Sequence, residues 1–234
     1  MPAKNSVKEY LENGYYHLYN RGVEKRKVFL DERDFSVFTS YLKTYLSPKD
    51  EKKLGQIIDS PETNPSEKYK ARIQLSLKNF SGEIELLAYS LLPNHFHLLV
   101  KQKSPDGIDR FMNALATRYS VYFNRHYKRV GPLWQGVYKA VSVESNNQLL
   151  WLSNYIHRNP LVKLNLPLNR WPEINWPFSL PEYLGQRKTD WIKPEEILSY
   201  FKKSDPGADY RDFISANLDP FILARIALDM EDEN

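Results

Sequence analysis

The stretch from Glu83 to Gln102, EIELLAYSLLPNHFHLLVKQ, decides the fold. Two apolar runs, 83–92 and 95–102, flank Pro93-Asn94, and runs of this length around turn residues predict two strands of a tight hairpin. Residues i and i+2 of a strand project from the same face, so His95 and His97 point one way while Phe96 points into the other layer. The chain therefore carries a β hairpin that presents two histidines side by side.

Helical and extended patterns alternate on both sides of this hairpin. Before the hairpin they predict a strand at 14–21, a helix at 31–46, and a loop or insertion within 48–80, of which residues 48–70 lack periodicity. After the hairpin they predict a helix at 108–128 and a strand at 137–143. A last helix is predicted from Ser145 or Asn146 to Asn159, and Pro160 helps to end it. This β-α-β-β-α-β order plus one more helix is typical of an α+β, ferredoxin-like fold with an antiparallel sheet.

The composition describes an ordinary globular chain. Its 234 residues are 41% hydrophobic and 26% charged, which suits one core with an appendage. It has no cysteine, which excludes disulfides, thiolate zinc sites and cysteine nucleophiles. The N-terminus resembles no signal peptide, and no run approaches the roughly 20 apolar residues of a membrane span. We expect a cytoplasmic protein without a membrane partner, nucleoid-associated if bacterial.

One stretch is basic and aromatic without any acid. Residues 110–143 hold six bases and seven aromatics, a composition that suits single-stranded nucleic acid because bases neutralise phosphates and rings stack on unpaired bases. Four of these side chains fall within an arc of about 60° on an ideal helix, namely Arg118, Tyr122, Arg125 and Arg129. The predicted DNA-binding residues here are Arg118, Tyr122, Arg125, Lys128 and Arg129. In the alternative interpretation, the aromatics are core and the bases a solvated face.

The C-terminal tail has the opposite charge. Residues 205–234 carry eight acids and two arginines, a balance of −6 against +10 for the rest of the chain. Apolar residues are too frequent for a disordered tail, so part of it is expected to dock as helix. Its acids then either face water from a helix that caps the core, or lie near the basic groove and compete with phosphates.

A tyrosine and an amide complete a candidate site. Tyr155 and Asn159 are four residues apart and share one helix face. Tyrosine can be a covalent nucleophile toward phosphorus because phenolate is a reasonable leaving group. Two histidines and an amide oxygen form a nitrogen and oxygen set suited to Mg²⁺ or Mn²⁺. Separately, each feature also has a plain explanation: histidines on a half-exposed strand face, and a tyrosine that packs.

Five ordered segments together resemble the single-tyrosine transposases of the HUH endonuclease superfamily and, among them, the REP-associated tyrosine transposases. They are Tyr19-Asn20-Arg21-Gly22, residues 92–99 (LPNHFHLL), residues 118–125 (RYSVYFNR), residues 131–136 (GPLWQG) and residues 155–160 (YIHRNP). The resemblance covers roughly residues 15 to 165. It implies a catalytic domain at 1–165, with 48–80 as an insertion, and a partly helical extension at 166–234.

The resemblance also implies a function and roles. The protein is expected to cut and rejoin single-stranded DNA near hairpins, as a monomer or homodimer. His95 and His97 match the metal-binding pair, Asn159 the third ligand, and Tyr155 the nucleophile that joins to the 5′ phosphate. Arg158 stands where the family is commonly aliphatic, and is either a further DNA contact or an exposed helix residue.

Other interpretations stay open. Tyr119 and Tyr122 are rival nucleophiles, although neither has an amide at i+4. His157 is expected to face away from Tyr155, and His17 and His126 to be structural or on the surface. The protein could instead be a domesticated hairpin-DNA-binding protein with weak or no catalysis. An RNA-binding ferredoxin-like module is a third possibility, but it has no use for a histidine pair matched with a tyrosine and an amide.

Overall fold

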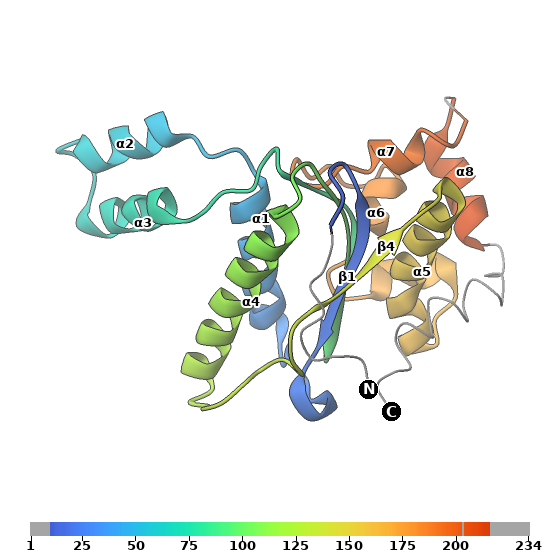
Figure 1. Ribbon diagram of the computed structural model, residues 1–234, viewed down its shortest axis with the longest axis horizontal. Helices are drawn as coiled ribbons and strands as arrows, with labels where there is room; N and C mark the ends of the chain where they lie inside the picture. Colours follow the sequence, from blue (N-terminus) through green and yellow to red (C-terminus); the bar gives the residue numbers. More distant parts are fainter. Residues whose placement is uncertain (1–9, 203, 216–234) are drawn as a thin grey trace.

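A computed structural model describes residues 10–202 and 204–215, and its centre is a four-stranded sheet (Figure 1). The strands are β1 (Tyr15–Arg21), β2 (Ile84–Leu92), β3 (His95–Gln102) and β4 (Lys139–Val143). They lie in the order β2-β3-β1-β4 and every pair is antiparallel. Together with α1 and α4 they form the β-α-β-β-α-β arrangement, so the predicted α+β, ferredoxin-like fold is confirmed.

Helices cover both faces of the sheet (Figure 1). The longer ones are α1 (Glu32–Leu46), α4 (Gly107–His126) and α5 (Asn146–Leu164), and the shorter ones are η1 (Val23–Lys25), η2 (Leu168–Glu173), α6 (Leu180–Tyr183), α7 (Glu195–Leu198) and α8 (Pro206–Ser215). α1 and α4 pack on one face, and α5 packs on the other.

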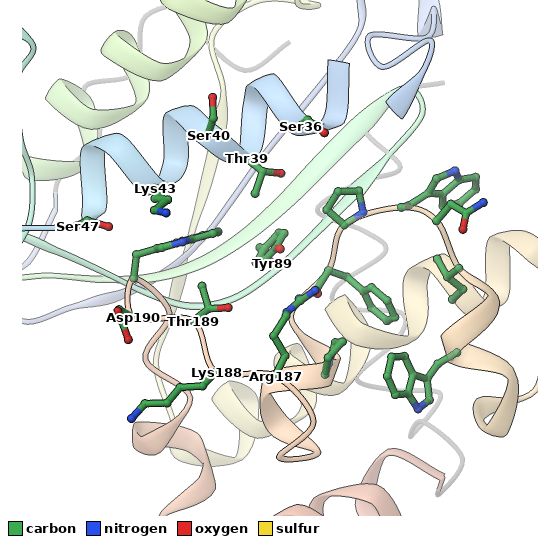
Figure 2. Close-up of a pocket in the computed structure, with 18 residues that line it drawn as sticks. Ser36, Thr39, Ser40, Lys43, Ser47, Tyr89, Arg187, Lys188, Thr189 and Asp190 are labelled. Atoms are coloured by element: carbon green, nitrogen blue, oxygen red, sulfur yellow. The ribbon is translucent and has the colours of Figure 1, made fainter. Parts of the chain in front are cut away.

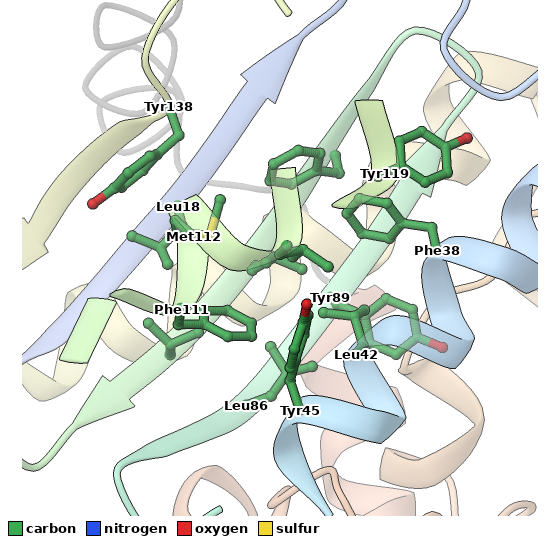
Figure 3. Close-up of a cluster of buried hydrophobic side chains, with 14 of the residues drawn as sticks. Leu18, Phe38, Leu42, Tyr45, Leu86, Tyr89, Phe111, Met112, Tyr119 and Tyr138 are labelled. Carbon is green, nitrogen blue, oxygen red and sulfur yellow. The ribbon is translucent and has the colours of Figure 1, made fainter. Parts of the chain in front are cut away.

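Each face has its own hydrophobic core. Under α1 and α4 the core is aromatic, with rings such as Phe38, Phe96 and Tyr119 fully buried and in contact (Figure 3). Under α5 it is largely aliphatic, and its members include Leu99, Leu152 and Ile156. Alternate residues of β3 therefore enter different cores, as the period of a strand requires. The two histidines lie on the α5 face.

The insertion differs from its prediction. Instead of an aperiodic loop, it forms two helices, α2 (Glu51–Asp59) and α3 (Pro65–Ser76), which extend away from the sheet (Figure 1). Their starts are capped: the side chain of Asp50 accepts from the Lys53 amide, and that of Asn64 accepts from the Glu67 amide. Only Ala71 is buried in these two helices. α2 has a short apolar stripe of half-buried residues at helical spacing, Leu54, Ile57 and Ile58, which the prediction of an aperiodic segment missed, whereas α3 has little periodicity.

The helix after β4 is longer than predicted. α5 continues through Pro160 to Leu164 and ends at Asn165, which has the left-handed backbone conformation (φ 53°). Proline removes one backbone donor from a helix interior. Here Pro160 and Leu161 are both buried, so packing offsets the lost bond. The extension places Lys163 on the same helix as Tyr155 and Asn159.

The chain beyond α5 packs against the sheet rather than away from it. Phe178 pairs with Ser90, and Ile192 with Leu86, so this segment covers the outer edge of β2. Covering an edge strand prevents it from pairing with other chains. α8 packs on α5 with Tyr210 and Ile214 buried, as the expected docking of the tail requires. The remainder of the acidic tail, 216–234, lies outside the described residues, and the domain boundary at residue 165 stays a prediction.

Candidate active site on the sheet face under α5

The histidine pair lies at the end of β3, beneath α5. His97 is fully buried and His95 is half-buried, and their ring centroids are 4.9 Å apart. Register pairs His95 with Arg21 and His97 with Tyr19 across β1. The short Pro93-Asn94 turn and the alternation of β3 thus place both imidazoles on one face, as predicted from their spacing.

α5 brings the other two predicted residues to the histidines. The Asn159 Nδ2 atom is 3.2 Å from His97 Nε2, and the Tyr155 ring centroid is 5.5 Å from that of His97. Tyr155 and Asn159 are at positions i and i+4 of α5, so both point from one face of this helix toward β3. The structure therefore brings together His95, His97, Tyr155 and Asn159, which are distant in the sequence.

Burial sets the protonation of this cluster. The pKa of His95 is lowered to about 4, mainly by desolvation and to a smaller extent by the charges of Lys163 and Arg21. Desolvation also lowers the pKa of His97 well below its usual value. Both imidazoles are thus neutral near pH 7, which is the form that binds metals. Burial raises the pKa of the Tyr155 phenol, and the hydrogen bond with the Asn159 side chain partly offsets this rise.

The donor set fits a divalent ion that keeps open positions. Among the described residues, no group of three or more His, Asp or Glu side chains is arranged to hold a metal. A metal would therefore be bound by His95 and His97 with the Asn159 amide, and phosphate or water oxygens would complete its coordination. Both histidines are neutral, and the Nδ1 atom of His95 is already engaged, 2.8 Å from Asn94 Oδ1. Two neutral imidazoles and one amide are donors that suit a divalent metal ion.

Several nearby residues were not predicted from the sequence. His17, on β1, is buried and its Nε2 atom is 2.9 Å from His97 Nδ1. The expectation that His17 is merely structural or on the surface therefore overlooked a direct partner of the pair. Arg21 and Lys163 add positive charge beside His95. Pairing between β1 and β3 is non-local, so spacing along the sequence carried no signal for His17 or Arg21.

The predicted DNA-binding residues lie elsewhere. Five are on or just after α4, on the opposite face of the sheet. The Arg118 guanidinium lies over the Tyr41 ring at 4.0 Å, the Tyr122 hydroxyl donates to Asp34, and Arg129 donates to Asn124. Arg125 and Lys128 are exposed. Arg158 is half-buried on α5 and donates to the Ile214 carbonyl at 3.4 Å. The structure does not bring these residues together with the histidine pair.

The rival residues are engaged in other contacts. Tyr119 is buried on the α4 side, where its hydroxyl donates to the Val28 carbonyl at 2.6 Å. His157 faces away from Tyr155, as expected, and its two ring nitrogens are each 2.7 Å from a hydroxyl, of Tyr210 and of Ser179. His126 is exposed and stacks on Tyr122. Of these tyrosines and histidines, none reaches the cluster around His97.

A cavity of about 740 Å³ lies between α1 and residues 171–191, and none of the predicted site residues lines it (Figure 2). Tyr89, Trp191 and several hydroxyl groups of α1 form its walls. Its one arginine, Arg187, donates to both carboxylate oxygens of Glu182 at 2.6 and 2.8 Å, so that charge is already matched. The cavity therefore adds nothing to the chemistry of the histidine pair.

Comparison with known proteins agrees with this arrangement. Residues 62–159 match the sequence profile of the family described as "Transposase IS200 like". This segment is therefore similar to IS200-like transposases. The matched segment contains both histidines, Tyr155 and Asn159, so the resemblance expected from the sequence motifs is confirmed for the family. No curated protein matches the sequence. Within residues 10–202 and 204–215, no helix is long and apolar enough to cross a membrane.

Two solved structures are similar to this chain. One is a REP-associated tyrosine transposase bound to a REP hairpin, with 15% identity, 81% of this chain and 91% of that chain covered, and a TM-score of 0.45. The other is the crystal structure of a protein described as "a putative transposase from deinococcus radiodurans r1". It is 19% identical, 66% of this chain and 96% of that chain are covered, and the TM-score is 0.35.

Proposed function

We propose that this chain is a metal-dependent endonuclease and strand transferase that acts on single-stranded DNA near hairpins through a phosphotyrosine at Tyr155. One observation carries the proposal. Asn159 and Tyr155, from one face of α5, converge on His97, with the amide nitrogen 3.2 Å and the ring centroid 5.5 Å away. A nucleophile beside a metal-ligand set in a transposase relative supports DNA strand cleavage.

The chemistry would be an exchange of phosphodiester bonds. The Tyr155 oxygen attacks phosphorus, its proton leaves, and the bond to the 3′ oxygen breaks as that oxygen takes up a proton. The 5′ phosphate stays on Tyr155 and a free 3′ hydroxyl remains. The reverse attack by a 3′ hydroxyl restores a phosphodiester, so no external energy source is needed.

The surrounding residues would serve this exchange in distinct ways. A divalent ion bound by His95, His97 and Asn159 would polarise the scissile phosphate. Arg21 and Lys163 supply positive charge beside His95, which suits a phosphate group. Burial raises the pKa of the Tyr155 phenol, and the hydrogen bond with Asn159 counters this, so Asn159 would favour the deprotonated nucleophile. The exposed Arg125 and Lys128 would bind the DNA backbone.

The proposal is tested by looking for a covalent adduct. The protein is incubated with Mn²⁺ or Mg²⁺ and a labelled pool of hairpin oligonucleotides with randomised single-stranded flanks. We expect a denaturant-resistant adduct that disappears in Tyr155→Phe, in His95→Ala and with a strong chelator. Asn159→Ala should weaken the adduct, and excess Mn²⁺ should restore part of it.

Two outcomes would overturn the proposal. Cleavage that continues in a strong chelator would remove the metal from the reaction. Hairpin binding without any adduct, under every metal condition, would favour the alternative of a domesticated hairpin-binding protein.

A further inference from the structure

The buried residue His17 contacts one of the proposed metal ligands directly. It lies on β1 with 3% of its surface exposed, and its ring stacks on that of His97 with centroids 5.1 Å apart and an interplanar angle of 25°. The His17 Nε2 atom is 2.9 Å from His97 Nδ1. His17 also lies outside the segment that matches the transposase profile. Its role must therefore be argued from its contacts.

The two neighbours of His97 together define where its proton lies. A neutral imidazole has one nitrogen with a proton and one with a lone pair. The Asn159 amide nitrogen, a donor, is 3.2 Å from His97 Nε2, so Nε2 is the acceptor. The proton then resides on Nδ1, which donates to His17 Nε2 across 2.9 Å. In this arrangement Nε2 of His97 carries a lone pair, which a metal would bind in place of the Asn159 amide hydrogen.

The direction of the bond between the two histidines therefore decides whether His97 can act as a ligand. If His17 donated instead, the His97 proton would be on Nε2, and that nitrogen could not bind a metal. His95 shows the same pattern with a different partner. Its Nδ1 atom is 2.8 Å from the Asn94 side-chain oxygen, which can only accept, so its Nε2 is also free of a proton. Both histidines thus use Nδ1 for a supporting hydrogen bond.

We infer that His17 is a positioning residue that fixes the tautomer and ring orientation of His97 by accepting its Nδ1 proton. The inference rests on the proposed function, since it concerns His97 as a metal ligand. Supporting partners of this kind typically change metal affinity by about 10–100-fold when removed. His17 differs from a packing histidine because its acceptor nitrogen, rather than its ring volume, performs the role.

The test compares two replacements at this position. His17→Phe keeps a ring but loses the acceptor, whereas His17→Gln supplies a side-chain oxygen that can accept the same proton. We expect His17→Phe to weaken Mn²⁺ binding, measured by calorimetry on the DNA-free protein, by at least about tenfold. His17→Gln should stay within about threefold of the unsubstituted protein. Thermal unfolding of both variants identifies any loss that arises from misfolding.

A second measurement does not involve metal or activity. Long-range nitrogen NMR of the metal-free protein reports the tautomer of each histidine, and His→Gln variants assign the five signals. We expect His97 to carry its proton on Nδ1 in the unsubstituted protein and in His17→Gln, and to lose this preference in His17→Phe. A proton on Nε2 of His97 in the unsubstituted protein would overturn the inference even if His17→Phe did not fold.

The inference and the proposed function fail in different ways. If the unsubstituted protein binds no Mn²⁺, the metal-dependent function fails. If it binds Mn²⁺ and a folded His17→Phe binds it equally well, only the role of His17 is overturned.

Discussion

The two faces of the sheet use the same strands for different purposes. Toward α1 and α4, β3 contributes Phe96, Leu98 and Val100 to a core of packed rings and aliphatic side chains. Toward α5 it contributes His95 and His97, which require hydrogen-bond partners because a buried polar group without one is costly. Both faces have a hydrophobic core, but only the α5 face also uses β3 to bear buried histidines, which stability alone does not require.

This difference explains why the basic, aromatic composition of residues 110–143 located the candidate site less well than the two histidines did. The rings of residues 110–143 that were candidates for stacking on DNA bases include Phe111, Tyr119 and Phe123, which are buried in the α4 core. Only the exposed cations of this region remain available to DNA without rearrangement. The interpretation of the aromatics as core is therefore correct for these three, and DNA binding by Arg125 and Lys128 stays a prediction.

The largest expected effects separate adjacent residues of β3. His97→Ala should abolish adduct formation, because it removes a proposed ligand, while the protein stays folded. Leu98→Ala, on the other face, should lower the free energy of unfolding by about 2–5 kcal/mol yet leave adduct formation intact in the folded fraction. Urea unfolding and the adduct assay measure both. If Leu98→Ala removed the activity of folded protein, the two faces would not be functionally separate.

Acid should destabilise the protein through its buried histidines. Burial lowers the pKa of His17 and His157 to about 3 and that of His95 to about 4, below the usual 6.5. The unfolded chain then binds more protons between these values, so stability is complete above pH 6.5 and falls as the pH drops toward 4. We expect a loss of roughly 1–2 kcal/mol per histidine between pH 7 and 5.

Urea unfolding of the metal-free protein at pH 7 and pH 5 checks this expectation. His157→Gln should reduce the loss, because it removes one buried imidazole. His126→Gln is the matched control: His126 is exposed on α4, so its replacement should leave the loss unchanged. A stability that does not change over this range would show that the imidazoles are not buried as neutral groups.

A smaller effect distinguishes cations on the two faces. Arg21→Ala with Lys163→Ala, beside His95, should slow adduct formation at saturating DNA by about tenfold, because a phosphate contact is lost at the reacting group. Arg125→Ala with Lys128→Ala, at the end of α4, should instead leave that rate unchanged. It should weaken DNA binding and reduce the log–log salt slope by about one to two units.

Filter binding at several salt concentrations and single-turnover kinetics separate these two results. An unchanged salt slope in the α4 double variant would place those two cations on a solvated face that does not touch DNA. An unchanged rate in the double variant of Arg21 and Lys163 would exclude both from the reacting phosphate.

Local patterns predicted what depends on local physics. The hairpin around Pro93-Asn94, the alternation of β3, and the i,i+4 spacing of Tyr155 and Asn159 follow from backbone geometry, and the structure has all three. α3 was missed because its cap, rather than an apolar stripe, marks it, and α2 was missed because its apolar stripe is only three residues long. The end of α5 was misplaced because Pro160 is tolerated when its neighbours are buried.

Contacts between distant strands could not be predicted in this way. His17 reaches His97 only because β1 pairs with β3 in a register that places His97 opposite Tyr19. A register shift by one residue would turn His17 to the other face. Single-sequence reasoning has no access to that register, so the partner of a predicted ligand was assigned to packing.

The central claim is that Tyr155 is the residue that joins to DNA, and peptide mapping of the adduct tests it most directly. Trypsin cleaves after Lys139 and Arg158, and the resulting peptide 140–158 contains Tyr155 as its one tyrosine. Mass spectrometry of a nuclease-trimmed adduct should find the nucleotide phosphate on this peptide. A phosphate on the peptide 119–125, which holds Tyr119 and Tyr122, or on the β1 peptide that holds Tyr19, would contradict the claim.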